Sequence, residues 1–258
     1  MEYTSVLVSK IENIGIVTLN RPEFNNTFSV PLAIELNHAL IDFENDPCVN
    51  VIVINANGRN FCTGIDINDL AGKSNHDYLI WIELMEKMNM TIASMGKPVI
   101  ASVQRIAVAN GIGLVAACDL AIAAEDAKFG ATAINVGLFC MGPAVPLLKS
   151  LGRKKTLELI LTGDIIDAFE AQRIGLINKI VPAQKLEAET LKYAKKLACK
   201  SPLALQLGKK SFYEMEDLDY KKALDLTNNH FATLCSTEDA HEGVSAFLGK
   251  REPVWKCK

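Results

Sequence analysis

The sequence predicts an α/β fold in which strand–strand–helix units repeat and a helical region follows. Short β-branched runs alternate with segments of helical periodicity as far as Val181, and residues 183–248 read as almost wholly helical. The chain has 258 residues, of which 49% are hydrophobic and 22% charged. This balance is typical of a folded globular protein that is large enough to bury a substantial core.

The first half of the chain alternates between expected strands and helices. Residues 5–11 and 14–20 are two short strands around the turn at Glu12-Asn13, a hairpin. A helix is expected after Ser29, because Pro31 suits the first helical turn, and Asp46-Pro47 ends it. The further expected elements are a buried strand at 49–54, a long helix at 75–95, a strand at 99–103, a short apolar helix at 110–118 and a strand at 119–124.

The second half is predicted to be mainly helical. Helices are expected at 143–151, 153–162 and 167–173, followed by a strand at 177–181 that Pro182 ends. No linker or low-complexity segment divides the chain, and Ser201-Pro202 is the best candidate boundary. We therefore predict an α/β core over residues 1–200 and a C-terminal helical region over 201–258.

Composition narrows the class of protein. The net charge of −3 and the lack of a basic cluster argue against nucleic-acid binding. Seven cysteines, with no C-x-x-C pair, indicate reduced thiols and a cytoplasmic protein. The N-terminus lacks the features of a signal peptide, and no apolar stretch is long enough to span a membrane. The four histidines have no metal-ligand spacing, so no metal site is expected.

Two glycine-containing turns offer backbone N–H groups that could polarise a carbonyl. The segment Asn60-Phe-Cys-Thr-Gly-Ile-Asp-Ile67 follows a buried strand, and Asn110-Gly111 begins an apolar helix. N–H groups in such turns and at helix N-termini lack ladder partners and can face a developing oxyanion. Two ordinary tight turns in an α/β core would use the same residues, so both interpretations stay open at this point.

Several motifs, in order over roughly residues 5–255, resemble those of the crotonase (enoyl-CoA hydratase/isomerase) family. They are FCTGIDI at 61–67, KPVIASVQRIAVANGIG at 97–113, AACDLAIAA at 116–124, LTGD at 161–164, GLIN at 175–178 and EGVSAFLGKR at 242–251. The resemblance implies a crotonase fold, a spiral of strand–strand–helix turns with a helical C-terminal trimerisation region. It also implies that the N–H groups of Ile65 and Asn110 form an oxyanion hole, although the family usually has glycine where this chain has Asn110.

Both carboxylates that hydratases of this family use as acid and base are missing. The resemblance places them at Gly113 and Ala133. Hydration of an enoyl thioester needs a base that activates water and an acid that protonates the α-carbon, and neither residue supplies one. Possible substitutes lie close to Ala133 in the sequence, namely Cys140, Asn135 and Thr132.

The resemblance also implies a set of CoA-binding residues. They are Cys62, Gly64, Asp66, Ile67, Lys250 and Arg251. The last two would meet the CoA phosphates of a neighbouring subunit, whereas by default they are solvated charges. Cys62 and Cys140 are candidate nucleophiles, but neither has a histidine or lysine close in sequence, and buried structural thiols are the commoner case.

The resemblance therefore implies an acyl-CoA thioester-binding protein, nominally an enoyl-CoA hydratase or isomerase, with CoA as part of the substrate and no other cofactor. Three classes stay open: a lyase or isomerase that uses substitute groups or a substrate carboxylate, a thioester hydrolase or decarboxylase that needs mainly the oxyanion hole, and a non-catalytic acyl-CoA binding protein. The expected partners are acyl-CoA and further copies of the chain in a homotrimer or homohexamer, with neither nucleic acid nor a membrane.

Overall fold

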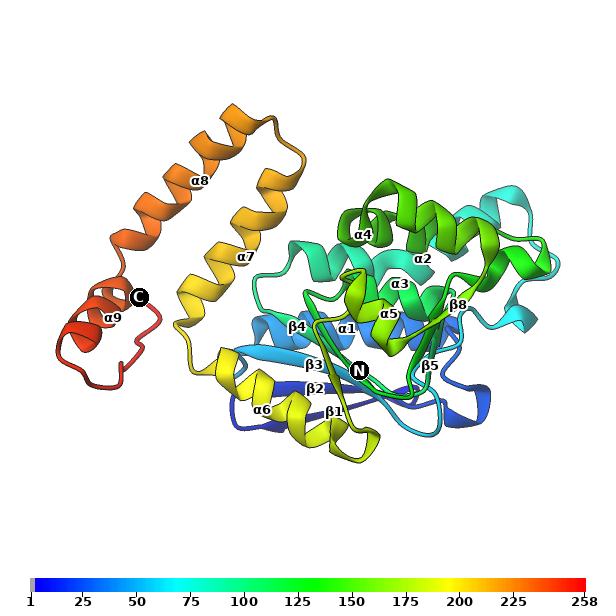
Figure 1. Cartoon of the computed structure of the whole chain (residues 1–258), viewed down its shortest axis with the longest axis horizontal. Coiled ribbons are helices and arrows are strands. Elements are labelled where there is room, and N and C mark those ends of the chain that lie inside the picture. Colours follow the sequence, from blue (N-terminus) through cyan, green and yellow to red (C-terminus); the bar gives the residue numbers. More distant parts are fainter. Residues whose placement is uncertain (1–2) are drawn as a thin grey trace.

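The computed structural model describes residues 3–258 as a core of two sheets and surrounding helices, from which a helical arm extends (Figure 1). The strands are β1 (Val6–Ile11), β2 (Ile14–Leu19), β3 (Val51–Ala56), β4 (Val99–Val103), β5 (Ile106–Val108), β6 (Leu120–Ala124), β7 (Lys128–Gly130), β8 (Ile165–Asp167) and β9 (Lys179–Val181). The α-helices are α1 (Val30–Asn45), α2 (Asn75–Ser94), α3 (Asn110–Ala117), α4 (Met141–Thr162), α5 (Ala168–Arg173), α6 (Leu186–Ala198), α7 (Pro202–Glu216), α8 (Tyr220–Cys235) and α9 (Glu238–Leu248). Short 3-10 helices are η1 (Pro22–Phe24), η2 (Ile67–Asp69), η3 (Thr132–Val136) and η4 (Ala183–Lys185).

The main sheet has the strand order β1-β2-β3-β4-β6-β9 and is parallel except for the predicted β1–β2 hairpin. Successive side chains of its strands point to opposite faces. On β3, Ile52 and Ile54 enter the larger core, which α1, α2 and α3 cover, whereas Val51 and Val53 pack in a second core against α6. Burial on both faces explains why β3 begins as a continuous apolar run.

A second, three-stranded sheet was not predicted. It has the order β5-β7-β8, with β5 and β7 parallel and β7 and β8 antiparallel. Each of these strands has three residues, which is too short for a periodicity to show in the sequence. The sheet nevertheless matters for function, because β5 leads directly into α3.

The predicted helices are present, with local signals at their ends. Ser29 caps α1 by accepting a hydrogen bond from the Leu32 N–H at 3.4 Å, and Ser74 and Asp77 form a capping box at the start of α2. The two helices expected at 143–151 and 153–162 form the single element α4, interrupted where Gly152 has φ 73° and ψ 168°. Helix α4 begins earlier than expected, at Met141.

The helices after residue 201 form an arm beside the core. Figure 1 shows α7 and α8 as an antiparallel pair, with α9 at the end of the molecule opposite α2 and α4. The C-terminal segment folds back on this arm through Asp239, whose side chain is only 1% exposed. The Asp239 carboxylate accepts hydrogen bonds from the Ser201 hydroxyl at 2.7 Å and from the backbone N–H groups of Lys256 and Cys257 at 2.7 and 3.1 Å.

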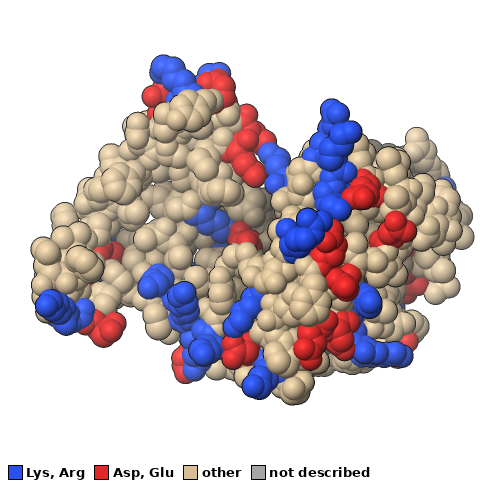
Figure 2. All heavy atoms as spheres, in the orientation of Figure 1, with Lys and Arg blue, Asp and Glu red and all other residues tan. Residues whose placement is uncertain are grey.

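Surface charges of both signs are mixed over the face in view (Figure 2). Within residues 3–258 no helix combines the length and the apolar character that a bilayer crossing requires. The same part of the chain contains no cluster of three or more His, Cys, Asp or Glu side chains arranged to hold a metal ion.

Candidate active site

Strand β5 brings the two predicted glycine turns together. The Cys62 N–H donates to the Ile106 carbonyl at 3.1 Å, and the Val108 N–H donates to the Cys62 carbonyl at 3.0 Å, so the loop after β3 lies beside β5. Each segment then runs two residues further, the first to Gly64 and the second to Asn110. An ideal Cβ placed on Gly64 would lie 3.9 Å from the Asn110 nitrogen.

Both predicted oxyanion donors are free. The Ile65 N–H and the Asn110 N–H donate no hydrogen bond to any atom of residues 3–258. Asn110 is the first residue of α3, so its N–H precedes the helical ladder. Two unpaired N–H groups on adjacent backbone segments can stabilise one oxyanion.

The backbone around these donors is constrained. Gly64 has φ +105°, and a Cβ there would lie 2.8 Å from the Cβ of Ala109. Ala109 has φ 50° and ψ −117°, a conformation that costs a non-glycine residue about 1–3 kcal/mol. Its N–H donates to the Gly130 carbonyl at 2.9 Å, which helps to hold this conformation. Strain of this kind is concentrated at functional sites.

Gly111 allows α3 to approach the loop after β3. A Cβ on Gly111 would lie 2.2 Å from the Cys62 carbonyl oxygen and 3.0 Å from its carbonyl carbon. No rotation of a side chain can relieve contact with a backbone carbonyl. The spacing between the two N–H donors therefore depends on a hydrogen atom at position 111.

Gly113 and Ala133, where the family's carboxylates were expected, lie on different elements. A Cβ on Gly113 would meet Pro143 of α4, at 2.9 Å from its Cβ and 3.1 Å from its Cα. Ala133 is partly buried in η3 and packs against the main core. Close packing against Pro143 leaves little room for a longer side chain at position 113 in this backbone.

A carboxylate that sequence reasoning missed lies beside Asn110. Glu86 of α2 accepts a hydrogen bond from the Asn110 side-chain amide at 2.9 Å and another from the Asn89 amide at 2.6 Å. Gly142, near the start of α4, leaves space for it, because a Cβ there would lie 2.1 Å from Glu86 Oε1. Glu86 lies beside the buried side of α2, between Met85 and Met88. No sequence motif distinguishes it from a solvated helix carboxylate.

The surroundings of Glu86 suit proton transfer. Burial raises the pKa of Glu86 to about 7, although the hydrogen bonds from Asn110 and Asn89 favour the charged form. Cys140, which caps α4, is 4% exposed. Its pKa is raised mainly by burial and also by the negative charge of Glu86, so its thiol stays protonated. Full burial raises the pKa of Cys62 to about 12, and its thiol donates to the Gly64 carbonyl.

The other candidate substitutes differ in position. Thr132 is partly buried at the start of η3. Asn135 is exposed, and its amide donates to the Gly163 carbonyl at 3.4 Å, at the C-terminal end of α4. Neither side chain hydrogen-bonds to Glu86, whose side-chain partners are Asn110 and Asn89.

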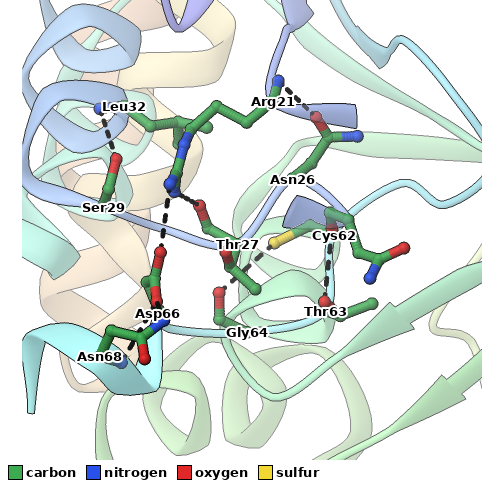
Figure 3. A network of polar contacts seen from close by, with 11 residues as sticks. Arg21, Asn26, Thr27, Ser29, Leu32, Cys62, Thr63, Gly64, Asp66 and Asn68 are labelled. Carbon is green, nitrogen blue, oxygen red and sulfur yellow. Dashed lines mark hydrogen bonds and ion pairs between the residues drawn. The ribbon is translucent and has the colours of Figure 1, made fainter. Parts of the chain in front are cut away.

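Asp66 is part of a polar network at the entrance to η2 (Figure 3). It accepts a hydrogen bond from the Arg21 guanidinium at 3.1 Å and one from the Asn68 amide at 2.9 Å, while Arg21 also donates to the Thr27 carbonyl at 2.7 Å. Burial alone would raise the pKa of Asp66, but these hydrogen bonds outweigh it and lower the pKa. Ile67, the next residue, is 72% exposed.

The predicted CoA-binding pair Lys250 and Arg251 follows α9, which lies on the arm (Figure 1). Arg251 forms an ion pair with Glu242, in which the two guanidinium–carboxylate hydrogen bonds measure 2.5 and 2.8 Å. The Arg251 side chain also donates to the Ser245 hydroxyl at 3.4 Å, so its hydrogen-bond partners in the described residues lie on α9 and in the segment that follows it.

Comparisons with known proteins identify the family. A family model described as "Enoyl-CoA hydratase/isomerase" matches residues 9–258. The mouse protein named enoyl-CoA hydratase domain-containing protein 3, mitochondrial, is 35% identical over 245 residues, which are 95% of this chain and 82% of that protein. The 2,3-dehydroadipyl-CoA hydratase of Escherichia coli is 32% identical over 261 residues, covering 98% of this chain and 99% of that enzyme.

Solved structures agree with this assignment. An enoyl-CoA hydratase from Mycobacterium smegmatis superposes with a TM-score of 0.94 at 35% identity, covering 98% of this chain and 99% of that one. Human enoyl-CoA hydratase domain-containing protein 3 superposes with a TM-score of 0.93 at 35% identity, covering 98% and 100%. The architecture is thus that of enoyl-CoA hydratases. The chain belongs to the crotonase (enoyl-CoA hydratase/isomerase) family, as its motifs predicted.

Proposed function

We propose that this chain binds an acyl-CoA thioester with the carbonyl oxygen between the N–H groups of Ile65 and Asn110. The observation that carries the proposal is the pair of unpaired donors that β5 holds on adjacent segments. Family membership supports the thioester as ligand. Both donors are backbone groups fixed by packing, so they need no reorganisation when negative charge develops on the oxygen.

The nominal activity is that of an enoyl-CoA hydratase or isomerase, and we propose that hydration of simple 2-enoyl-CoA esters is weak. Neither Gly113 nor Ala133 has a group that can transfer a proton. Each general acid or base typically contributes about 100- to 10,000-fold to the rate. Loss of both family carboxylates leaves the oxyanion hole and substrate positioning, together with whatever other groups the site provides.

Asp66, Ile67, Cys62 and Gly64 are proposed to line the CoA-binding segment, and no cofactor besides the CoA moiety of the substrate is required. The proposed assembly is a trimer or hexamer built on the helical arm, which would bring Lys250 and Arg251 of one subunit to the CoA phosphates of another. Large apolar side chains left exposed on the arm support this assembly, for example Phe212 at 54%, Phe231 at 67% and Phe247 at 83%. A cytoplasmic location stays a prediction.

A panel of saturated, 2-unsaturated, 3-unsaturated and malonyl-type CoA esters, incubated with the pure protein and analysed by mass spectrometry, tests the proposal. We expect binding of acyl-CoA and slow hydration of crotonyl-CoA. Turnover of crotonyl-CoA at about 10 per second or faster, an ordinary enzymatic rate, would contradict the weak-hydratase proposal. Release of free CoA or of carbon dioxide would favour the thioesterase or decarboxylase alternative, and binding with no product would favour a non-catalytic role.

A further inference from the structure

Asn110 connects the Glu86 carboxylate to the candidate oxyanion hole. Asn110 supplies an unpaired backbone N–H, and its side-chain amide holds Glu86 Oε1 at 2.9 Å. Because both functions come from one residue, the carboxylate lies within the length of an asparagine side chain plus two hydrogen bonds of the proposed thioester oxygen, one from the backbone N–H to that oxygen and one from the side-chain amide to Glu86. A base at this position can reach the α- and γ-carbons of an acyl chain when that chain extends from the oxyanion hole toward α2.

We propose that Glu86 is the catalytic acid/base of this site and that it carries a proton between C2 and C4 of a 3-enoyl-CoA thioester. This inference rests on the proposed function and names its substrate class. It explains how a site without the expected carboxylates at positions 113 and 133 can still carry out acid/base chemistry.

The reaction needs only one carboxylate. Glu86 removes a proton from C2, and the electrons of the C–H bond move toward the thioester carbonyl to give a dienolate, whose oxygen the two N–H groups stabilise. The protonated Glu86 then returns the proton to C4. The double bond moves from C3–C4 to C2–C3, and no water, oxidant or second reactant is consumed. Hydration, in contrast, requires an activated water as well.

The hydrogen bonding of Glu86 leaves it able to accept a proton. Asn110 donates to Oε1 and Asn89 donates to Oε2. A carboxylate has about four lone-pair positions, so both oxygens keep free ones. The two amides fix the orientation of the carboxylate, which a general base requires. Their presence on both sides also distinguishes Glu86 from a mobile surface carboxylate.

The protonation equilibrium suits the same role, because burial raises the pKa of Glu86 to about 7 and a general acid/base works best near the operating pH. The titratable group that faces Glu86 from α4 is the Cys140 thiol, which burial keeps neutral. From α3 the facing side chain is the neutral Asn110. On α2 itself, Glu83 and Lys87 are exposed.

The test uses trans-3-hexenoyl-CoA as probe in deuterium oxide, with mass spectrometry for isomerised and deuterated product and calorimetry for binding. Glu86→Gln keeps the side-chain size and removes the base. Glu83→Gln, one turn earlier on the same helix and exposed, is the matched control. We expect wild type and Glu83→Gln to form the 2-enoyl product. Glu86→Gln should lose about 100-fold or more in kcat, with acyl-CoA affinity unchanged within about twofold.

The pH profile of the wild type is a second readout that does not depend on any variant. We expect kcat/KM to rise with pH through about 7, because Glu86 must be ionised to accept the C2 proton. Equal turnover by Glu86→Gln, a flat profile across this range, or tight binding of the probe without isomerisation or deuterium uptake would each overturn the assignment while leaving the proposed thioester binding intact. Failure of the wild type to bind acyl-CoA would overturn the proposed function itself.

Discussion

Replacing Gly111 with alanine should move the two N–H donors apart and destabilise the protein. The added Cβ would lie 2.2 Å from the Cys62 carbonyl oxygen, well inside normal contact. That carbonyl accepts the 3.0 Å hydrogen bond from Val108 that aligns the loop with β5. Relief of the contact therefore requires the loop and α3 to separate.

The size of the effect follows from three contributions. Overpacking a close-packed site costs about 1–3 kcal/mol, and a buried hydrogen bond left without its partner costs about 1–3 kcal/mol. Alanine gains about 1 kcal/mol over glycine from helix propensity. We expect a net loss near 3 kcal/mol, which lowers Tm by roughly 6–12 °C in a domain of this size.

Thermal unfolding of Gly111→Ala and Gly113→Ala, with acyl-CoA affinity measured on both, gives the comparison. Both glycines lie in α3, so the propensity gain is shared. Gly113→Ala meets Pro143 rather than a carbonyl of the oxyanion loop, so its net cost should be only about 0–2 kcal/mol. If Gly111→Ala is as stable as wild type, or more stable than Gly113→Ala, the close approach does not constrain the site as argued.

Three further predictions concern charge. The folded-state pKa of Glu86 is raised to about 7, so the native state keeps this proton to a higher pH than the unfolded state does, and the stability of the wild type falls as pH rises from the ordinary glutamate range through 7. Glu86→Gln should therefore be more stable than wild type at pH 8, by up to about 3 kcal/mol. An equal Tm of the two proteins at pH 8 would contradict this prediction. The lowered pKa of Asp66 implies a stabilisation that is present above the ordinary aspartate pKa and is lost as pH falls through the lower folded-state pKa. Arg21→Ala should therefore make the free energy of unfolding fall less steeply with decreasing pH in the acid range. A pH dependence parallel to that of wild type would refute this prediction. The double change Lys250→Ala/Arg251→Ala should weaken acyl-CoA binding at low salt with Tm nearly unchanged, since exposed ion pairs stabilise by about 1 kcal/mol or less; an unaltered Kd would exclude these residues from the CoA site.

The long, periodic elements could be predicted from the sequence because their signals are local. The hairpin at the N-terminus, the capped helix after Ser29 and the buried strands all carry turn residues and apolar patterns within about ten residues. The three strands of the small sheet could not, because each has three residues and pairs only with distant segments. The sequence located both turns of the candidate site, but the strand that brings them together appears only in the structure.

Glu86 shows a different limit of sequence reasoning. The family resemblance points to positions 113 and 133, which are glycine and alanine in this chain. The nearby carboxylate comes instead from α2, whose sequence shows only a glutamate beside an apolar stripe. Its significance arises from contacts across three helices, with Asn110 on α3 and Gly142 on α4. A glutamate introduced at position 113 would first have to overcome the close contact with Pro143.

The buried carboxylate of Asp239 works as a non-covalent clasp. It ties Ser201, at the root of the arm, to Lys256 and Cys257, which come after all three arm helices. The contacts close two loops that meet at Asp239, with sequence separations of 38 residues to Ser201 and 17 residues to Lys256, and closing such loops in an unfolded chain carries an entropic cost. Opening the clasp with Asp239→Ala would leave the C-terminal segment held to the root of the arm by the 2.9 Å hydrogen bond from the Trp255 indole N–H to the Cys199 carbonyl, so that segment would fluctuate more even where each arm helix remained folded.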